Sequence, residues 1–487
     1  MILSQERGFL KAQAVFGVLC ESVLRAGKEG RRLDEVEREL FAQLMELGRT
    51  LAQEFVNRAG DGDVGLTQKT DEGATLHRSA KRHPRRYLSI FGELTIARWV
   101  YARRGGQKIE LTPLDQKLGL PEGDFSYVLQ DWQQRMCLKE SIHESVTSLR
   151  ELLGVAPSVR AAEVMNQRMA ELAGSFRYEQ PRPPANEEEQ ILVVTADGKG
   201  VPMRRPLEER IRSSPRRGKG EKANKKQMAY VGAVYSIAPF IRSADDVVDE
   251  LRRRERAADR PAPQHKQVWV EMTMQDEEEG CTGREMLFAE LAVSCHQRNP
   301  QHRKDLVCLM DGEKGLWTVR QEWIKDAIEI LDLLHALERL WAVAHCFHPE
   351  KSREAEDFVN HRLRMLLEGK VGYVIGGMRR LLATTRNLTT ERRRTIHGCI
   401  RYYDNNRSRM KYDEYLAAGY PIGSGVAEGA CRHVVKDRME QTGMRWTING
   451  AQAMLHLRAI YLNGDWNSYL NYRIEAEQAA LYGHTAA

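Results

Sequence analysis

The chain has 487 residues, of which 42% are hydrophobic and 29% are charged. This length is too great for one hydrophobic core, so we expect two or three domains of ordinary globular composition. Lysine and arginine exceed aspartate and glutamate by 74 to 68, and the net charge of +6 tolerates an acidic partner without demanding one. The eight cysteines are scattered without a CxxC pair, and no apolar run could cross a membrane. A reduced, cytoplasmic protein without a membrane partner is therefore predicted.

The first 83 residues are expected to form a helical N-terminal region. One apolar stripe recurs there at steps of three and four, as on a single helix face, and consists of Leu33, Val36, Leu40, Leu44, Leu47, Leu51 and Phe55. The stripe either packs into a core or pairs the helix with a second copy of the chain. A polar, glycine-rich segment at 60–73 ends this helical pattern.

Residues 84–179 are expected to hold a β-hairpin and three short helices. The hairpin turn is predicted at Gly92-Glu93, between two apolar strands. The helices that follow are broken at 154–158, which predicts either a DNA-binding helix-turn-helix or an ordinary trihelical unit. Three prolines and three glutamates at 180–189 then mark a domain boundary.

From residue 190 to 346 the pattern becomes that of a mixed α/β core. The apolar block at 191–194 suits a strand that is covered on both faces. Strands are expected at 191–201, 226–237, 267–272 and 305–312, with a helix at 283–298. Three strands, a helix, a fourth strand and further helices is the element order of an RNase H-like domain.

The remainder of the chain is expected to be helical. Residues 347–419 read as an all-α insertion, residues 420–465 as the final helices of the core, and residues 466–487 as a peripheral C-terminal tail. The predicted fold class is therefore α+β and multidomain, with a helical and hairpin N-terminal region, an RNase H-like catalytic core and a helical insertion.

Three acidic residues are the candidate metal ligands. Asp197 and Asp311 each follow an apolar strand, and Glu428 lies in the first turn of a helix that begins after a Pro and Gly turn. Carboxylates at a strand edge suit Mg²⁺ or Mn²⁺. We expect them to hold two ions, with Asp197 bridging both, Asp311 completing one and Glu428 the other. Each acid taken alone is more often a surface cap or turn residue.

Four motifs together resemble those of bacterial insertion-sequence transposases of the ISKra group, within the Mutator-like DDE superfamily. They are TADGKGV around Asp197, LMDGEKGLW around Asp311, the pair Asp332-x-x-His335, and PIGSGVAEGACRHVVKDRMEQTGMRW around Glu428. The resemblance spans about residues 191 to 462. It implies an RNase H-like core with a helical insertion before Glu428, metal-dependent cleavage at element ends, and strand transfer by a freed 3′-hydroxyl. The implied partners are double-stranded DNA of the terminal inverted repeats and the target, and at least one further copy of the chain.

His335 lies three residues after Asp332, which places both on one helical face or around a strand-to-helix turn. There His335 could contact the scissile phosphate or orient a water. A helix N-cap Asp with a packed His is the alternative. Two other readings are disfavoured: His345, Cys346 and His348 lack a fourth zinc ligand, and the glycines at 423–429 do not follow a dinucleotide-binding pattern.

Basic and aromatic residues supply the candidate DNA contacts. Between 204 and 226 there are ten Lys or Arg against three Glu, which describes a solvated loop or a phosphate-binding one. The residues selected as candidate DNA contacts come from this segment and from two later basic ones. They are Arg216, Arg217, Lys219, Arg407, Arg409, Lys411, Arg432, Lys436, Arg438, Arg445 and Trp446. Tyr402, Tyr403 and Tyr412 lie among them and could stack on frayed or flipped bases, unless the segment is only a solvated helix surface.

The sequence therefore predicts a metal-dependent DNA transposase. Two alternatives remain open. One is an RNase H-like nuclease or resolvase without strand transfer, and the other is a domesticated DNA-binding protein for which the three acids are dispensable.

Overall fold

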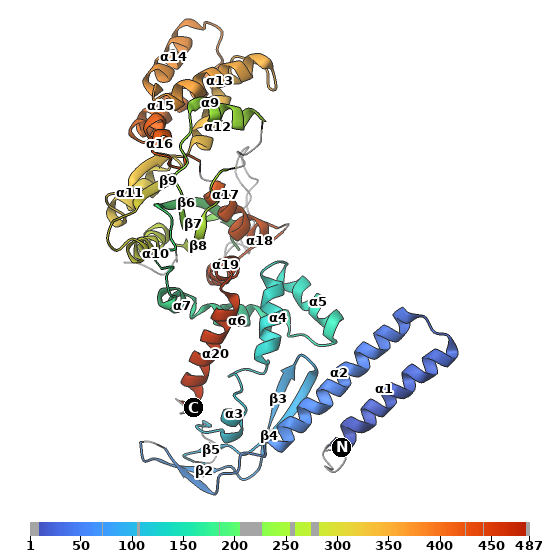
Figure 1. Ribbon diagram of the computed structural model, residues 1–487. Coiled ribbons are helices and arrows are strands. Elements are labelled where there is room, and N and C mark those ends of the chain that lie inside the picture. Colours follow the sequence, from blue (N-terminus) through green and yellow to red (C-terminus); the bar gives the residue numbers. More distant parts are fainter. Residues whose placement is uncertain are drawn as a thin grey trace, which may run out of the picture. The chain divides into compact units, whose positions relative to one another are not determined.

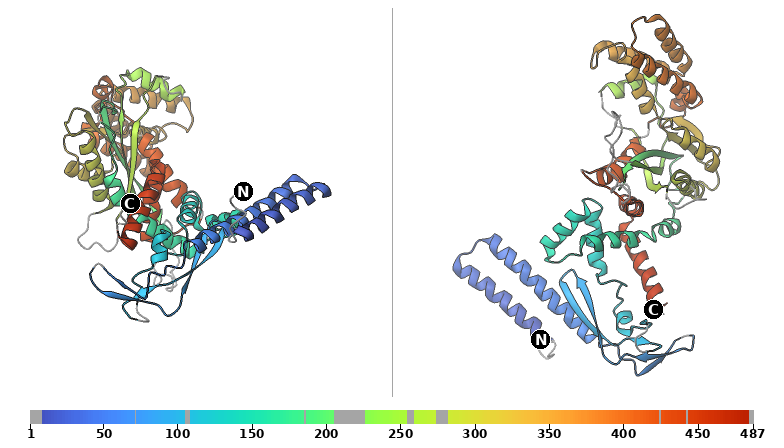
Figure 2. Two further views of the ribbon diagram at one scale, coloured as in Figure 1. Left: turned by 60° about the horizontal axis from the view of Figure 1, so that its bottom comes forward. Right: turned by 180° about the vertical axis from the view of Figure 1, so that it is seen from behind.

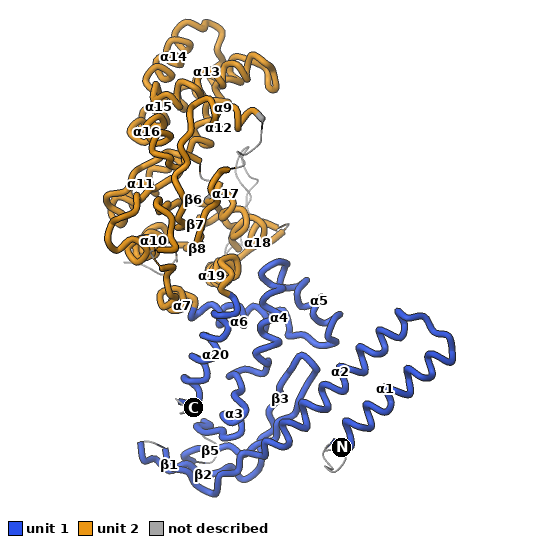
Figure 3. Tube along the Cα trace, viewed as in Figure 1, with its two compact units in different colours: residues 1–172, 466–487 blue, residues 173–465 orange. Residues whose placement is uncertain are grey.

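The computed structural model describes residues 9–70, 72–104, 108–184, 186–204, 226–253, 259–273, 282–423, 425–441 and 443–483. Helices and several sheets occur together, which confirms the mixed α+β class. The chain divides into two compact units (Figure 3): unit 1 is Met1–Leu172 with Trp466–Ala487, and unit 2 is Ala173–Asp465. In the described part of the chain, no helix is both long and apolar enough to span a membrane.

Unit 1 begins with a helical hairpin of α1 (Leu10–Glu29) and α2 (Leu33–Arg58), which lie side by side (Figure 1). Gly30 ends α1 in the left-handed conformation, with φ of 64°, which a glycine adopts without strain. Leu19 and Ala26 of α1 are buried, but none of the seven residues of the predicted stripe on α2 is. Three of the seven are half-buried, and the other four remain exposed: Leu33, Leu44, Leu51 and Phe55. The stripe is therefore only partly used inside one copy of the chain.

Five short strands follow in unit 1. They are β1 (Thr67–Lys69), β2 (Thr75–Arg78), β3 (His83–Ser89), β4 (Gly92–Arg98) and β5 (Tyr101–Ala102). The predicted hairpin is present as β3–β4, but its turn is two residues earlier than expected, because Ser89 pairs with Gly92. The Ser89 hydroxyl accepts a bond from the Phe91 N–H and donates one to the Gly92 carbonyl, which stabilises the turn at Ile90-Phe91.

The predicted three-helix segment is present in unit 1. After α3 (Pro113–Lys117) come α4 (Tyr127–Cys137), α5 (Ile142–Leu153) and α6 (Val159–Ala170). Ser141 and Ser158 cap α5 and α6 by accepting bonds from backbone N–H groups, and Gly154 ends α5 with φ of 72°. Buried Gln134 accepts a bond from Asn166, so a polar contact joins α4 to α6.

The expected peripheral tail is instead helix α20 (Trp466–Tyr482), which packs within unit 1. Trp466 is buried, and its indole N–H donates a 2.7 Å bond to Asp131. Tyr469 is also buried and donates to the Met169 carbonyl. Aromatic rings that seek both burial and a hydrogen-bond partner thus bring the last helix onto the N-terminal unit.

Unit 2 is built on one five-stranded sheet in the order β10-β9-β6-β7-β8. Its strands are β6 (Ile191–Pro202), β7 (Lys226–Ile237), β8 (Gln264–Met272), β9 (Asp305–Met310) and β10 (Ile328–Leu331). The pairs β6–β7 and β7–β8 are antiparallel, while β6–β9 and β9–β10 are parallel. The long strand β6 therefore joins an antiparallel half to a parallel half.

Alternate side chains of β6 enter two different cores. Ile191 and Val193 pack with helix α12 (Leu333–Ala344) and the insertion, whereas Leu192 and Val194 pack against α10 (Gly283–Arg298) and α11 (Lys314–Trp323). Figures 1 and 2 show helices on both faces of the sheet. The continuous apolar run expected of a doubly covered strand is thus present.

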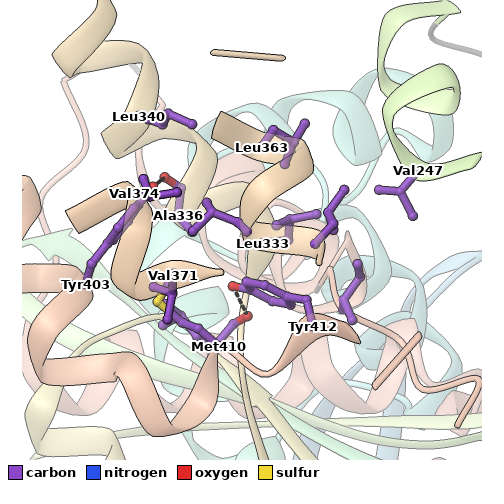
Figure 4. Packing of buried hydrophobic residues seen from close by; sticks show 14 of the residues in the cluster. Val247, Leu333, Ala336, Leu340, Leu363, Val371, Val374, Tyr403, Met410 and Tyr412 are labelled. Atoms are coloured by element: carbon purple, nitrogen blue, oxygen red, sulfur yellow. Dashed lines mark hydrogen bonds between the residues drawn. The ribbon is translucent and has the colours of Figure 1, made fainter. Parts of the chain in front are cut away.

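The all-α insertion forms a second layer over α12. Its elements are α13 (Arg353–Leu367), α14 (Val371–Thr384), α15 (Thr390–Asn406), the 3₁₀ turn η3 (Arg407–Arg409) and α16 (Tyr412–Ala417). Figure 4 shows Val371, Val374, Tyr403 and Tyr412 packed around Ala336 and Leu333 of α12. One continuous core therefore joins the insertion to the sheet.

The boundary between the units falls at Leu172/Ala173, not at the proline-rich segment 180–189. Helix α7 (Ala173–Glu179) and the segment after it belong to unit 2. Two ionic side chains explain the difference, because Arg182 bonds to Gln267 and buried Glu188 pairs with Arg298. The other helices of unit 2 are α9 (Ala244–Arg253), α17 (Gly425–Cys431), the π-helical turn η4 (Arg432–Lys436), α18 (Asp437–Met439) and α19 (Ile448–Leu462).

Candidate functional site

Three aspartates end up at the same level of three neighbouring parallel strands. Val194 of β6 pairs with Cys308 of β9, and continuing that register brings Asp197 opposite Asp311. Leu331 of β10 pairs with Met310, so the next residues, Asp332 and Asp311, are opposite each other as well. Parallel strands lie about 4.8 Å apart. The sheet therefore gathers Asp197, Asp311 and Asp332 at one edge.

Asp311 is held in a turn with its side chain partly buried. Its carboxylate accepts a 2.9 Å bond from the Glu313 N–H, and its carbonyl accepts a 2.6 Å bond from the Trp317 indole. Burial and the neighbouring charge of Asp197 raise the pKa of Asp311, although the bond from Glu313 opposes this. Within the described residues, neither Asp197 nor Asp311 forms an ion pair. The two carboxylates thus concentrate negative charge that a cation would relieve.

Asp332 and His335 are arranged as helix cap and first turn. The Asp332 carboxylate is buried and accepts a 2.7 Å bond from the Leu334 N–H at the start of α12. His335 is half-exposed, 3.7 Å from Glu338, and close enough to Asp311 to lower its pKa. Asp332 therefore has the capping role that the sequence left as the alternative, while the contact of the His335 ring is with Glu338.

Glu428 lies on helix α17, which packs on β6 and β7. The Glu428 side chain is exposed, and Cys431 follows it by one helical turn. The Cys431 thiol is buried, and burial followed by the Asp197 charge raises its pKa. The π-helical turn η4 begins at the next residue, a feature that often marks functional sites. The helix of Glu428 is therefore attached to the strand of Asp197.

The acidic edge, formed by Asp197, Asp311 and Asp332, offers oxygen donors of the kind that bind a divalent cation, but one observation limits this fit. Asp197 and Asp311 supply hard oxygen ligands of uncompensated charge, as Mg²⁺ and Mn²⁺ prefer. Among the described residues, however, no three His, Cys, Asp or Glu side chains are gathered closely enough to hold a metal ion together. Glu428 lies on helix α17, which packs on the strand of Asp197, but it is not gathered with two other such side chains into one ligand set.

Two residues at this edge were not selected from the sequence as metal or catalytic residues. Glu313 lies two residues after Asp311, and burial and the Asp311 charge raise its pKa while Arg284, 3.4 Å away, opposes this. Tyr402 of α15 accepts a 3.1 Å bond from the Gly312 N–H. The signal for Glu313 was available, because it belongs to the same motif as Asp311, but nothing in the sequence connects Tyr402 to that motif.

Several of the candidate DNA contacts are buried, which corrects the sequence interpretation. Arg438 is buried and stacks on Trp446, 4.9 Å from its ring centre, and the Trp446 indole donates to the Met439 carbonyl. Tyr403 and Tyr412 are buried too, with hydroxyls donating to the carbonyls of Ala336 and Leu331. These rings are not available for base stacking.

The other candidate contacts divide into three groups. Arg409 pairs with Glu329 at 2.5 Å and stacks on Trp317, so it serves the packing of the insertion. The exposed candidates are Arg407, Lys411, Arg432, Lys436 and Arg445. Arg216, Arg217 and Lys219 lie outside the described residues.

The chain matches no protein-family model, and no curated protein is significantly similar to it in sequence. The functional argument therefore depends on the geometry of the acidic edge.

Proposed function

We propose that the protein is a DDE-type DNA transposase with an RNase H-like core. One observation carries the proposal: in a sheet ordered β10-β9-β6-β7-β8, the parallel pairing of β6 with β9, continued by three residues, brings Asp197 within β6 opposite Asp311, which directly follows β9. An antiparallel meander followed by two parallel strands is the arrangement expected of that core. The resemblance of the four motifs to ISKra-group transposases points the same way.

Asp197, Asp311 and Glu428 would hold the divalent ions in this proposal. When bound, a pair of such ions supplies an activated water and stabilises the leaving oxygen of a phosphodiester. Glu428 would contribute from helix α17, which packs on β6, although among the described residues no three such side chains are gathered into one ligand set. His335, whose charge lowers the pKa of Asp311, would contact the scissile phosphate or orient a water. No covalent bond between protein and DNA is required.

Exposed cations near α17 support DNA as the substrate. Arg432 and Lys436 lie in the π-helical turn after the Glu428 helix, and Arg445 follows it. Such side chains bind phosphates without reading sequence. The proposed partners are the terminal inverted repeats of the element and the target DNA, together with a second copy of the chain, because two ends must be processed.

The test is incubation of the full chain with a DNA fragment that carries the flanks of its own gene, with and without Mg²⁺. The proposal expects Mg²⁺-dependent breaks at the element ends and, with precut ends, joined products. Cleavage without joining would favour a nuclease or resolvase. Full biological activity of Asp197→Asn would favour a DNA-binding protein and would refute the proposed chemistry.

A further inference from the structure

Positive charge is concentrated in one part of the helical insertion. Residues 371–411, which form α14, α15 and η3, contain nine arginines and one lysine against Glu391 and Asp404. This excess is larger than the net charge of +6 of the whole chain. Arginine presents a planar fork that matches phosphate oxygens in pairs, which lysine does not. The segment is therefore a candidate for phosphate binding.

Most of these arginines are not used to hold the insertion together. Arg379 pairs with Asp404 at 2.5 Å, and Arg393 donates to backbone carbonyls of Leu382 and Thr385. Six others are exposed and, among the residues that the structure describes, form no ion pair: Arg380, Arg386, Arg392, Arg394, Arg401 and Arg407. Their charge is thus available to a ligand.

An exposed aromatic ring lies in the same surface. Val371, Val374, Ile375 and Met378 form the buried face of α14, and Tyr373 is on the opposite face with 74% of its surface exposed. Arg380 follows two helical turns later on that face. Among the residues that the structure describes, nothing outside the neighbouring turns of α14 lies within 4 Å of the Cβ position at the intervening Gly376 and Gly377. A flat ligand could approach the ring without a steric obstacle.

Helix α15 connects this surface to the acidic edge. The guanidinium of Arg407, at the end of α15, lies 2.9 Å from the position a Cβ would occupy on Gly372, next to Tyr373. One turn earlier, Tyr402 bonds to the Gly312 N–H beside Asp311. Tyr373 and Arg407 are therefore close in the fold to the helix that contacts the Asp311 turn.

We propose that Tyr373, Arg380 and Arg407 form a surface that binds the end of the DNA, with the arginines on phosphates and the tyrosine ring stacked on an unpaired base. This inference rests on the proposed function and adds the part of the substrate that the insertion recognises. Stacking is suited to a frayed end because every base presents a flat face. In this proposal the stacking ring is that of exposed Tyr373, because Tyr403 and Tyr412, which the sequence suggested for stacking, are buried.

The test is binding of the full chain to two DNAs of one sequence, a blunt duplex and a duplex with a short unpaired end. Tyr373→Ala should lower affinity for the frayed DNA about tenfold, leave the blunt duplex unchanged, and leave the salt dependence unchanged. Arg380→Gln and Arg407→Gln should each weaken both DNAs and reduce the salt slope by about one.

Two matched controls accompany these variants. Tyr178→Ala removes another exposed tyrosine, and Arg353→Gln removes an exposed arginine of α13 in the same insertion. Both should bind like the unchanged protein. The inference would be overturned if Tyr373→Ala preferred frayed over blunt DNA as strongly as the unchanged protein does.

The outcomes separate this inference from the proposed function. If the unchanged protein cleaves element ends and Tyr373→Ala binds normally, the inference fails alone. If Tyr373→Ala loses the preference for frayed DNA but the unchanged protein does not cleave element ends with Mg²⁺, the binding surface is supported and the transposase proposal fails. If the unchanged protein binds neither DNA, both are refuted.

Discussion

The backbone N–H of Gly312 donates a 3.1 Å hydrogen bond to the hydroxyl oxygen of Tyr402. Gly312 directly follows Asp311, and Tyr402 belongs to helix α15 of the insertion. The guanidinium of Arg339 lies over the Tyr402 ring, 5.1 Å from its centre, which gives the ring a second contact. A residue of the insertion thus positions the turn that carries a proposed metal ligand.

Tyr402→Phe should therefore weaken metal use more than DNA binding. Loss of the phenol oxygen leaves the Gly312 N–H without this acceptor, at a cost of about 1–3 kcal/mol if the group stays buried. We expect the Mg²⁺ concentration for half-maximal cleavage to rise severalfold. The measurement is a Mg²⁺ titration of end cleavage, with binding followed separately.

Tyr420→Phe is the matched control for this experiment. Its hydroxyl donates a 3.0 Å bond to Asp305 at the opposite end of β9, away from Asp311. An identical rise in Mg²⁺ requirement for both variants would mean that Tyr402 has no special role in positioning Asp311.

Asp311→Asn and Glu428→Gln should each reduce cleavage about 100-fold or more while end binding is largely kept. Removing one electrostatic partner of a transition state acts on that scale. Glu322→Gln on the exposed surface of α11 is the control and should cleave normally. Loss of DNA binding in both site variants would show that these acids are structural.

The buried pair of Glu188 and Arg298 predicts an acid-sensitive stability. Burial raises the pKa of Glu188, but the bonds from Arg298 outweigh it and the net pKa is lowered. A lowered pKa contributes stability above the ordinary glutamate value of about 4.3, and this contribution is lost as pH falls through the folded value.

Glu188→Gln should cost about 3–5 kcal/mol of unfolding free energy at neutral pH, because it leaves buried Arg298 without its anion. The difference from the unchanged protein should begin to shrink as the pH falls below the ordinary glutamate value of about 4.3, and the contribution is lost as the pH passes the lowered pKa of folded Glu188. Urea unfolding of both proteins at several pH values measures this. A constant difference across that range would contradict the assignment.

The α1–α2 hairpin predicts self-association. Leu44, Leu51 and Phe55 lie at steps of seven and four on α2 and are 53%, 41% and 68% exposed. An apolar stripe of this kind is covered when helices of two copies pair. We expect Leu44→Glu with Leu51→Glu to convert a dimer to a monomer, as measured by light scattering, without loss of helix.

Ile241→Glu is a suitable control for the association experiment, since Ile241 is 73% exposed but lies outside the hairpin. A monomeric unchanged protein would refute this use of the stripe.

Local patterns predicted the elements of the core well, and long-range contacts explain the failures. The apolar run at 191–201 is β6 and the amphipathic run at 283–298 is α10. A strand that is buried on both faces is a continuous apolar run, and a helix that is buried on one face repeats its apolar residues every three or four positions, so both patterns can be read locally. Trp446 and Arg438 read as part of a basic DNA-binding segment, yet each is buried against the other. The local sequence does not distinguish an arginine that stacks in a core from one that binds phosphate.

The candidate site shows the same division. The strands that carry Asp197 and precede Asp311 could be read locally, but no strand was predicted at 328–331, and that Asp332 stands opposite Asp311 depends on the register of β9 and β10. No local pattern encodes that register. The contribution of Tyr402 depends likewise on a contact between residues far apart in the chain.

Helix α20 has a consequence for biosynthesis. Unit 1 contains both the first helices and the segment after residue 465, so the ribosome makes all of unit 2 before Trp466 and Tyr469 emerge. The hydrogen bonds of Trp466 to Asp131 and of Tyr469 to the Met169 carbonyl therefore cannot form until the end of translation. The part translated first is thus the part completed last.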